Sequence, residues 1–166
     1  MKLLSEQVDE KEIAVILREL SKTKEISGDV VEFGCFVGTT SVFLAKEIEK
    51  WNTEKMLWLY DSFEGLPEKS REDENSLGEV FKKGELLATK LIANLRKSGA
   101  RKMPKITKGW FSELSKEQIP RKISFAFLDG DYYLSILDPL NLIWENLESG
   151  AIIVVDDYGN QALPGA

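Results

Sequence analysis

The apolar residues of this chain gather into short runs that are separated by amphipathic stretches. Five of these runs, rich in branched and aromatic side chains, predict strands. They lie at Asp29–Gly34, Met56–Tyr60, Lys105–Trp110, Ile123–Leu128 and Ala151–Val155. The last run, AIIVV, shows no alternation of polar and apolar positions, which is typical of a strand covered on both faces.

Helical periodicity fills the intervals between these runs. The first helix carries one apolar face from Ile13 to Leu20, and Asp9 and Glu12 before it have capping-box spacing. Further helices are predicted at Thr39–Trp51, at Phe81–Lys97 before Gly99, and at Ser135–Leu147 before Gly150. Pro139 kinks the last helix unless that helix has only just begun there. The polar segment 70–79 predicts a surface loop.

Strands that alternate with helices predict an α/β fold. We expect a Rossmann-like, doubly wound domain with a mostly parallel sheet, strand order 3-2-1-4-5 and helices on both faces. No repeat or linker divides the chain, so we expect one domain, with a helical segment over 1–27 and the core over 28–166. In such sheets ligands bind beyond the carboxyl ends of the strands.

Composition and charge exclude several classes of function. With 28 acidic and 22 basic residues the formal charge is −6, so the chain has no electrostatic footprint for nucleic acid. No apolar run approaches the ~20 residues that cross a membrane, and MKLLSEQVDEKE turns acidic too early for a signal peptide. The chain has a single cysteine, Cys35, which predicts a reducing cytoplasmic location. We expect Cys35 to be a small apolar side chain that fills space in the core. The absence of histidine excludes a Ser-His-Asp triad, a Cys-His pair and histidine-ligated zinc.

The first predicted strand leads into a glycine-bearing loop, VVEFGCFVGTTS. Gly34 and Gly38 allow a tight turn and a close approach to a ligand. Because G-x-G-x-x-G is absent, an ordinary strand-to-helix turn is the alternative. Asp61, ending the second strand, suits a ribose hydroxyl pair, and Glu32, inside the first, suits an ammonium group. Together they favour a nucleoside with an amino-acid tail, S-adenosylmethionine, over a nicotinamide dinucleotide.

Four aspartates follow the fourth and fifth predicted strands. Asp129 and Asp131 lie in AFLDGDYY, and Asp156 and Asp157 lie in VVDDYG. Because these strands are neighbours in the predicted sheet, the four carboxylates meet at one rim. Capping of the next helix is an alternative for Asp131, but it does not account for all four. Such a group favours a hard divalent cation, with Mg²⁺ first and Mn²⁺ or Ca²⁺ as alternatives.

From about Gly28 to Ala166 the sequence resembles the macrocin O-methyltransferase (TylF-like) family. The resemblance is carried by DSFEGLPE at 61–68, GWF at 109–111, LDGDYYLSILDPL and VVDDYG. It implies a class I methyltransferase that uses S-adenosylmethionine and a divalent metal, commonly on hydroxyls of sugars or other natural products.

The resemblance also implies roles for the matching residues. Those assigned to the cofactor are Glu32, Gly34, Gly38, Ser41, Asp61, Ser62, Phe63, Trp110, Phe111 and Asp129. The first four would hold its methionine part, Asp61 its ribose, and the aromatic residues would surround adenine, with an ordinary core position as their alternative. The residues assigned to the metal are Asp129, Asp156 and Asp157. Asp131 remains as the general base that takes a proton from the acceptor hydroxyl.

Methyltransferases of this class continue after the fifth strand with an antiparallel strand pair, which this sequence, ending in NQALPGA, does not contain. An uncovered sheet edge invites pairing, so we expect either a less stable fold or a homodimer. The leading function is a metal-dependent O-methyltransferase acting on a small-molecule hydroxyl. Two alternatives remain: a non-catalytic S-adenosylmethionine-binding module and, less favoured, a nicotinamide-dependent oxidoreductase.

Overall fold

A computed structural model describes residues 3–5, 8–51, 53–76 and 87–166 of the chain. Its strands are β1 (Asp29–Phe33), β2 (Leu57–Asp61), β3 (Lys105–Lys108), β4 (Ile123–Leu128) and β5 (Leu147–Val155). Its helices are α1 (Glu10–Lys22), α2 (Thr39–Lys50), α3 (Leu87–Lys97) and α4 (Tyr133–Ile143). Short 3₁₀ turns occupy the connections: η1 (Arg71–Asp73), η2 (Phe111–Glu113), η3 (Lys116–Gln118) and η4 (Trp144–Asn146). The predicted alternation of strands and helices is confirmed.

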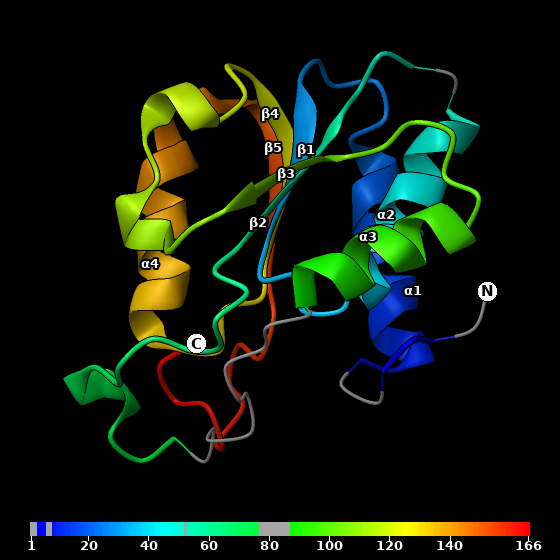
Figure 1. Cartoon of the computed structure of the whole chain (residues 1–166). Helices are drawn as coiled ribbons and strands as arrows, with labels where there is room; N and C mark the ends of the chain where they lie inside the picture. The colour runs from blue at the N-terminus through cyan, green and yellow to red at the C-terminus, as the bar shows by residue number, and fades with distance from the viewer. Residues whose placement is uncertain (1–2, 6–7, 52, 77–86) are drawn as a thin grey trace.

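The five strands form one sheet in the order β3-β2-β1-β4-β5. All four neighbouring pairs are parallel; Val31, for example, lies opposite Trp58 on one side and Ala126 on the other. Figure 1 shows α1, α2 and α3 on one face of the sheet and α4 on the other. This arrangement confirms the predicted doubly wound fold and its strand order.

The alternation of side chains along the strands divides the core into two layers. Toward α1–α3 the sheet contributes Val30, Leu57, Leu59, Phe125 and Phe127. Toward α4 it contributes Val31, Phe33, Tyr60, Ala126 and Leu128. All of these residues are buried, so β1, β2 and β4 are covered on both faces, as their uninterrupted apolar sequences predict.

Two helix boundaries follow the signals in the sequence. At the start of α1, Asp9 accepts hydrogen bonds from the N–H groups of Lys11 and Glu12, and Glu12 accepts one from Asp9, which forms the predicted capping box. Gly99, at φ 73°, ends α3, and the N–H of Ala100 bonds back to the Leu95 carbonyl. Residues 81–86, which the periodicity assigns to this helix, lie outside the described residues.

The predicted end of the last helix at Gly150 is wrong. Helix α4 ends at Ile143, η4 follows, and β5 already begins at Leu147. Gly150, at φ 83°, lies within β5, where the pairing with β4 is irregular between the pairs Ile123–Leu147 and Phe125–Ile152. The glycine therefore marks a bulge in a strand instead of a helix cap, because pairing with β4 outweighs the local helical pattern.

Two further features, a proline inside α4 and two buried polar residues in a predicted surface loop, differ from what the sequence pattern predicts. Pro139 lies inside α4, past its first turn, and so removes one backbone N–H from the middle of the helix. In the segment predicted as a surface loop, Asp73 and Ser76 are buried, whereas Arg71, Glu72, Glu74 and Asn75 are exposed. Residues 77–79 of that segment lie outside the described residues. Among the described helices, none has the length and apolar character needed to cross a bilayer.

Candidate active site at the carboxyl edge of the sheet

A cavity of about 590 Å³ lies at the carboxyl ends of the central strands. It is bounded by the segment after β2, by the segment after β3 and by the first turns of α4. Its lining residues are Asp61, Ser62, Gly65, Leu66, Pro67, Glu68, Trp110, Phe111, Ser112, Glu113, Gly130, Leu134, Ser135 and Asp138. This volume is within the range of sites for small molecules, ~300–1,000 Å³.

The three aromatic residues predicted for the cofactor occupy different places. Trp110 and Phe111 line the cavity, and Phe111 also packs edge-on against Phe33, with ring centroids 5.4 Å apart. Phe63 is 4% exposed and packs in the core layer beneath α2 and α3, so it is not among the cavity-lining residues. The structure therefore brings two of the three to the cavity.

The glycine loop between β1 and α2 needs its glycines for close packing. Gly34 has φ 87°, and a Cβ there would lie 1.8 Å from the Asp129 carbonyl oxygen. Gly38 has φ 84°, and a Cβ there would lie 2.2 Å from the Leu91 side chain. Both positions confirm the predicted tight turn and also bring β1 next to the first aspartate and α3 next to the loop.

Asp61 ties the glycine loop to the end of β2. One carboxylate oxygen, Oδ2, accepts hydrogen bonds from the N–H groups of Cys35 (2.7 Å) and Phe36 (2.9 Å). The other, Oδ1, accepts one from Phe63 at 2.6 Å, and the Ser62 hydroxyl closes the next turn with a bond to Gly65. The aspartate is thus held rigidly at the cavity wall by backbone groups.

Glu32 is a buried acid in β1 that forms no ion pair with a basic side chain among the described residues. It is 1% exposed, and its Oε2 has no hydrogen-bond partner among the described residues; nor has the buried Ser41 Oγ in the first turn of α2. Burial raises the pKa of Glu32 to about 8, the Asp61 charge adds to the rise, and the Ser41 hydroxyl opposes it. The unpartnered Oε2 of Glu32, buried beside the Ser41 hydroxyl, fits a ligand that donates hydrogen bonds, such as an ammonium group.

Glu32→Gln is expected to stabilise the ligand-free protein at pH 7 by up to about 3 kcal/mol. An unfolded chain releases the Glu32 proton near pH 4.5, whereas the folded protein holds it until about pH 8. The free energy of unfolding of the wild-type protein is therefore undiminished by Glu32 below about pH 4.5 and falls as the pH rises toward 8. Urea denaturation at several pH values measures the difference between the two proteins, which should widen as the pH rises.

The exposed Glu74 provides a matched control for this substitution. Glu74→Gln changes the same chemical group without removing a buried carboxylate, so its stability should follow the wild-type protein at every pH. Parallel pH profiles for wild type and Glu32→Gln would contradict the assignment of the raised pKa to Glu32.

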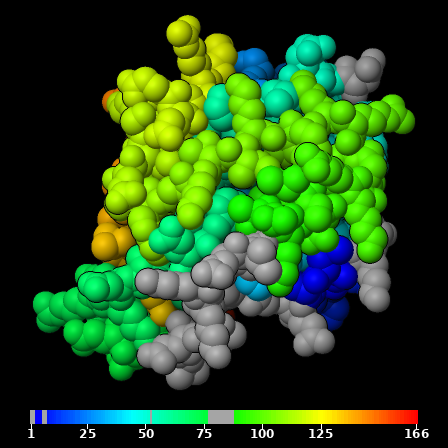
Figure 2. All heavy atoms as spheres, in the orientation of Figure 1, coloured from blue at the N-terminus to red at the C-terminus, as the bar shows by residue number. Residues whose placement is uncertain are grey.

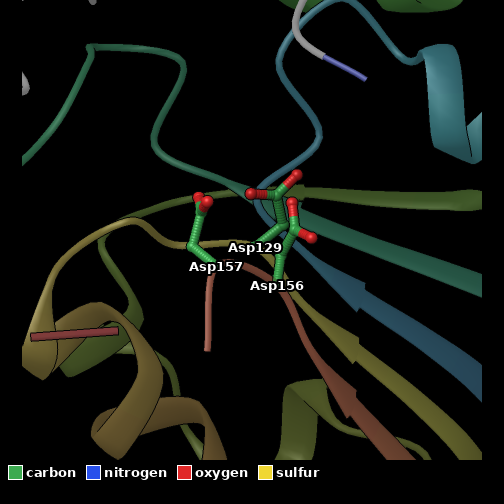
Figure 3. Close-up of side chains that lie close together, drawn as sticks. All are labelled: Asp129, Asp156 and Asp157. Carbon is green, nitrogen blue, oxygen red and sulfur yellow. The ribbon is translucent and has the colours of Figure 1, made fainter. Parts of the chain in front are cut away.

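The four aspartates lie together beside the cavity. Backbone hydrogen bonds to Phe33 and Leu128 continue the sheet as far as Asp129 and Asp156, and so place these residues at neighbouring strand ends. Carboxylate oxygens of Asp129, Asp156 and Asp157 lie within 4.8 Å of one another. Figure 3 shows the three side chains pointing to the same side of the sheet edge.

This clustering raises the pKa values of the acids. Burial, then the charge of Asp156, raises the pKa of Asp129 well above its usual range. Burial, then Asp157, raises the pKa of Asp156 to about 6, and the same two causes raise that of Asp131 to about 7. Three oxygen ligands that repel one another fit a hard divalent cation, which would offset this repulsion.

Asp131 stands apart from this trio in its backbone. It has φ 62°, a left-handed conformation that aspartate tolerates better than most residues. The N–H of Tyr132 bonds to the Gly130 carbonyl at 2.7 Å and closes a tight turn around Asp131. The turn separates Asp131 from Asp129, as the glycine between them in the sequence suggests.

Sequence reasoning missed several cavity residues. Leu66, Pro67 and Glu68 lie within the motif DSFEGLPE, but no role was predicted for them. Leu134, Ser135 and Asp138 come from α4. Their spacing of one and then three residues, directly after the DGD motif, places them on one helix face, which is the signal that points to a wall of the site.

A family model described as Macrocin-O-methyltransferase (TylF) matches residues 11–164 of the chain. Among curated proteins, the chain is similar to 8-demethyl-8-(2,3-dimethoxy-alpha-L-rhamnosyl)-tetracenomycin-C 4'-O-methyltransferase of Streptomyces olivaceus. Identity is 30% over 149 residues, which cover 82% of this chain and 55% of that protein. Mycinamicin III 3''-O-methyltransferase of Micromonospora griseorubida is 24% identical over 143 residues, covering 80% and 56%. The chain thus spans about half the length of these relatives.

The fold is also similar to that of a solved O-methyltransferase, NovP. The two structures agree with a TM-score of 0.73 at 21% identity, over 93% of this chain and 66% of NovP. At this identity the likeness supports the Rossmann-like methyltransferase fold.

Proposed function

This chain belongs to the macrocin-O-methyltransferase (TylF) family, and from that premise we propose that it transfers a methyl group from S-adenosylmethionine to a small-molecule hydroxyl with the help of a divalent cation. The observation that carries this proposal is the meeting of three features at one sheet edge. These are the cavity, the glycine loop with its unsatisfied Glu32, and the carboxylate trio.

The cofactor would lie across the carboxyl ends of β1 and β2. S-adenosylmethionine supplies an already activated methyl group. Glu32 would bind the ammonium group of the cofactor, which would favour the ionised carboxylate and give its Oε2 a hydrogen-bond partner. The Ser41 hydroxyl lies beside this carboxylate. Asp61 lines the cavity and would bind the ribose, and Trp110 and Phe111 would provide flat apolar surfaces for the base. Glu32→Gln should therefore bind the cofactor more weakly while it stabilises the free protein.

The catalytic problem is to remove a proton from an alcohol and to aim its oxygen at the methyl group. Asp129, Asp156 and Asp157 would hold the cation, which we propose to be Mg²⁺. A bound cation supplies positive charge that favours the ionised form of a hydroxyl beside it. Asp131, outside the trio and partly buried, accepts the proton.

We propose a sugar or related polyol as the acceptor. The two curated relatives are named as a 4'-O- and a 3''-O-methyltransferase, and the substrate in the first name carries a rhamnosyl group. A cation held on one side by three carboxylates suits two neighbouring hydroxyls of a vicinal diol or of a catechol-like compound.

Calorimetry and a transfer assay test the proposal together. S-adenosylhomocysteine should bind, NAD should not, and labelled methyl groups should pass from S-adenosylmethionine to a rhamnoside only when Mg²⁺ is present. Binding of S-adenosylhomocysteine without transfer to any polyol or phenol would favour a non-catalytic binding module. Binding of NAD alone would favour an oxidoreductase.

We further propose that the chain pairs with a second copy along β5. At the opposite edge, β3 carries Lys105 and Lys108, charges that discourage pairing, whereas Ala151–Val155 in β5 has none. Sedimentation velocity should show dimers that increase with protein concentration. A monomer throughout a wide concentration range would contradict this pairing.

A further inference from the structure

Asp73 is a buried carboxylate that no step of the proposed reaction uses. It is the last residue of η1 and is 0% exposed. Its Oδ2 accepts hydrogen bonds from the N–H (3.1 Å) and the hydroxyl (2.6 Å) of Ser70. Its Oδ1 accepts one from the backbone N–H of Tyr133 at 3.0 Å. Since burying a carboxylate is costly unless hydrogen bonds compensate, its position in a polar loop requires an explanation.

The bond to Tyr133 caps a helix from a distant part of the chain. Tyr133 is the first residue of α4, and Tyr132 before it makes no side-chain capping bond. Asp73 satisfies one of the free N–H groups at this terminus from 60 residues away. Its negative charge also lies where the helix dipole favours it.

The capped helix begins directly after the turn that presents Asp131. That turn holds Asp131 at φ 62° and is closed by the bond from Tyr132 to Gly130. A sparsely populated backbone conformation persists only where the surrounding structure fixes it. Strand β4 fixes the upstream end, and Asp73 fixes the downstream end through Tyr133.

The same bond joins two walls of the cavity. The loop that carries Asp73 follows the lining residues Ser62 and 65–68, and α4 supplies the facing wall. Figure 1 shows η1, the start of α4 and the C-terminal segment close together, and in Figure 2 the loop around η1 projects at the lower left.

The C-terminal segment packs tightly against this bond. A Cβ on Gly165 would lie 2.0 Å from Asp73 Oδ1 and 3.0 Å from the Tyr133 nitrogen. Only glycine fits at this distance, and the contact shields the bond from water.

We propose that Asp73 is a positioning residue, which fixes the start of α4 and thereby the turn that presents Asp131 to the acceptor hydroxyl. The inference rests on the proposed function, because it assigns Asp73 an effect on turnover through Asp131. It also links the loop after DSFEGLPE to the opposite wall of the cofactor cavity.

Three variants test this role at a temperature where each is fully folded. Asp73→Ala should lower kcat about 100-fold, as small misplacements of catalytic groups do, with a smaller change in the KM for the acceptor. The Tyr133 amide should exchange with solvent about tenfold faster, because its capping bond is lost. In Asp73→Asn both kcat and the exchange rate of the Tyr133 amide should lie between those of wild type and Asp73→Ala. Its amide oxygen can still accept the hydrogen bond from Tyr133, but its NH₂ group faces the Ser70 N–H, which is also a donor. Glu72→Gln, an exposed neighbour in η1, should match wild type.

The readouts separate this inference from the proposed function. Folded Asp73→Ala with wild-type kcat and a protected Tyr133 amide would overturn the positioning role. If the loss of kcat in Asp73→Ala disappears on cooling as the unfolded fraction disappears, Asp73 acts only on stability. That result would also overturn the positioning role. If the wild-type chain transfers no methyl group to any acceptor, the proposed function fails, while amide exchange at Tyr133 still decides whether Asp73 fixes the start of α4.

Discussion

Asp131→Asn is expected to lower the turnover number by about 10²–10⁴-fold, the range of a lost general base. Asparagine has nearly the shape of aspartate and also tolerates the left-handed conformation of this residue, φ 62°. The turn between Gly130 and Tyr132 should therefore survive. What the variant lacks is a carboxylate that can take the proton from the acceptor hydroxyl.

Methyl transfer under saturating substrates measures this loss, and calorimetry with S-adenosylhomocysteine measures cofactor binding separately. The cofactor affinity should remain within about twofold, because the proposal gives Asp131 a contact with the acceptor hydroxyl and none with the cofactor. Asp131→Ala provides the comparison: alanine is strained at φ 62°, so this variant should lose stability as well as turnover. Wild-type turnover in Asp131→Asn would remove Asp131 from the reaction.

Removal of divalent cations should lower methyl transfer by about 100-fold or more, since such a cation is worth several kcal/mol at a developing negative charge. Treatment with EDTA followed by gel filtration tests this, and added Mg²⁺ should restore the activity. Full activity in the stripped protein would contradict the metal assignment.

A stability measurement tests the same site without any substrate. Mg²⁺ should raise the melting temperature of wild type, because it binds the folded carboxylate trio and not the unfolded chain. In Asp156→Asn this shift should be lost. The metal-free variant should nevertheless be at least as stable as wild type, because the charge of Asp156 contributes to the raised pKa of Asp129. An unchanged Mg²⁺ shift in the variant would place the cation elsewhere.

Most of the fold could be predicted because its signals are local. Apolar runs marked β1, β2, β4 and the second half of β5, and the capping residues of α1 lie only three positions apart. Where the prediction failed, a distant segment decided the outcome. Gly150 has the local features of a helix end, but pairing between Leu147 and Ile123 draws the preceding residues into β5.

The candidate site divides in the same way. The sequence by itself determined which acids follow β4 and β5, because residues that end parallel neighbouring strands must meet at one edge. It also placed Gly34 and Gly38 in a tight turn, because glycine readily adopts the positive φ that both residues have there.

Only the tertiary structure decided which side chains face the cavity and which are buried. Phe63 and Phe111 are equivalent as residues, but one packs beneath α2 and α3 and the other lines the site. From the sequence, Asp73 is one of several acids in a polar loop. Its contact with the start of α4 is visible only in the tertiary structure. Its role depends on a contact between residues that are 60 positions apart in the sequence. Such contacts arise from tertiary packing and cannot be predicted from a local sequence pattern.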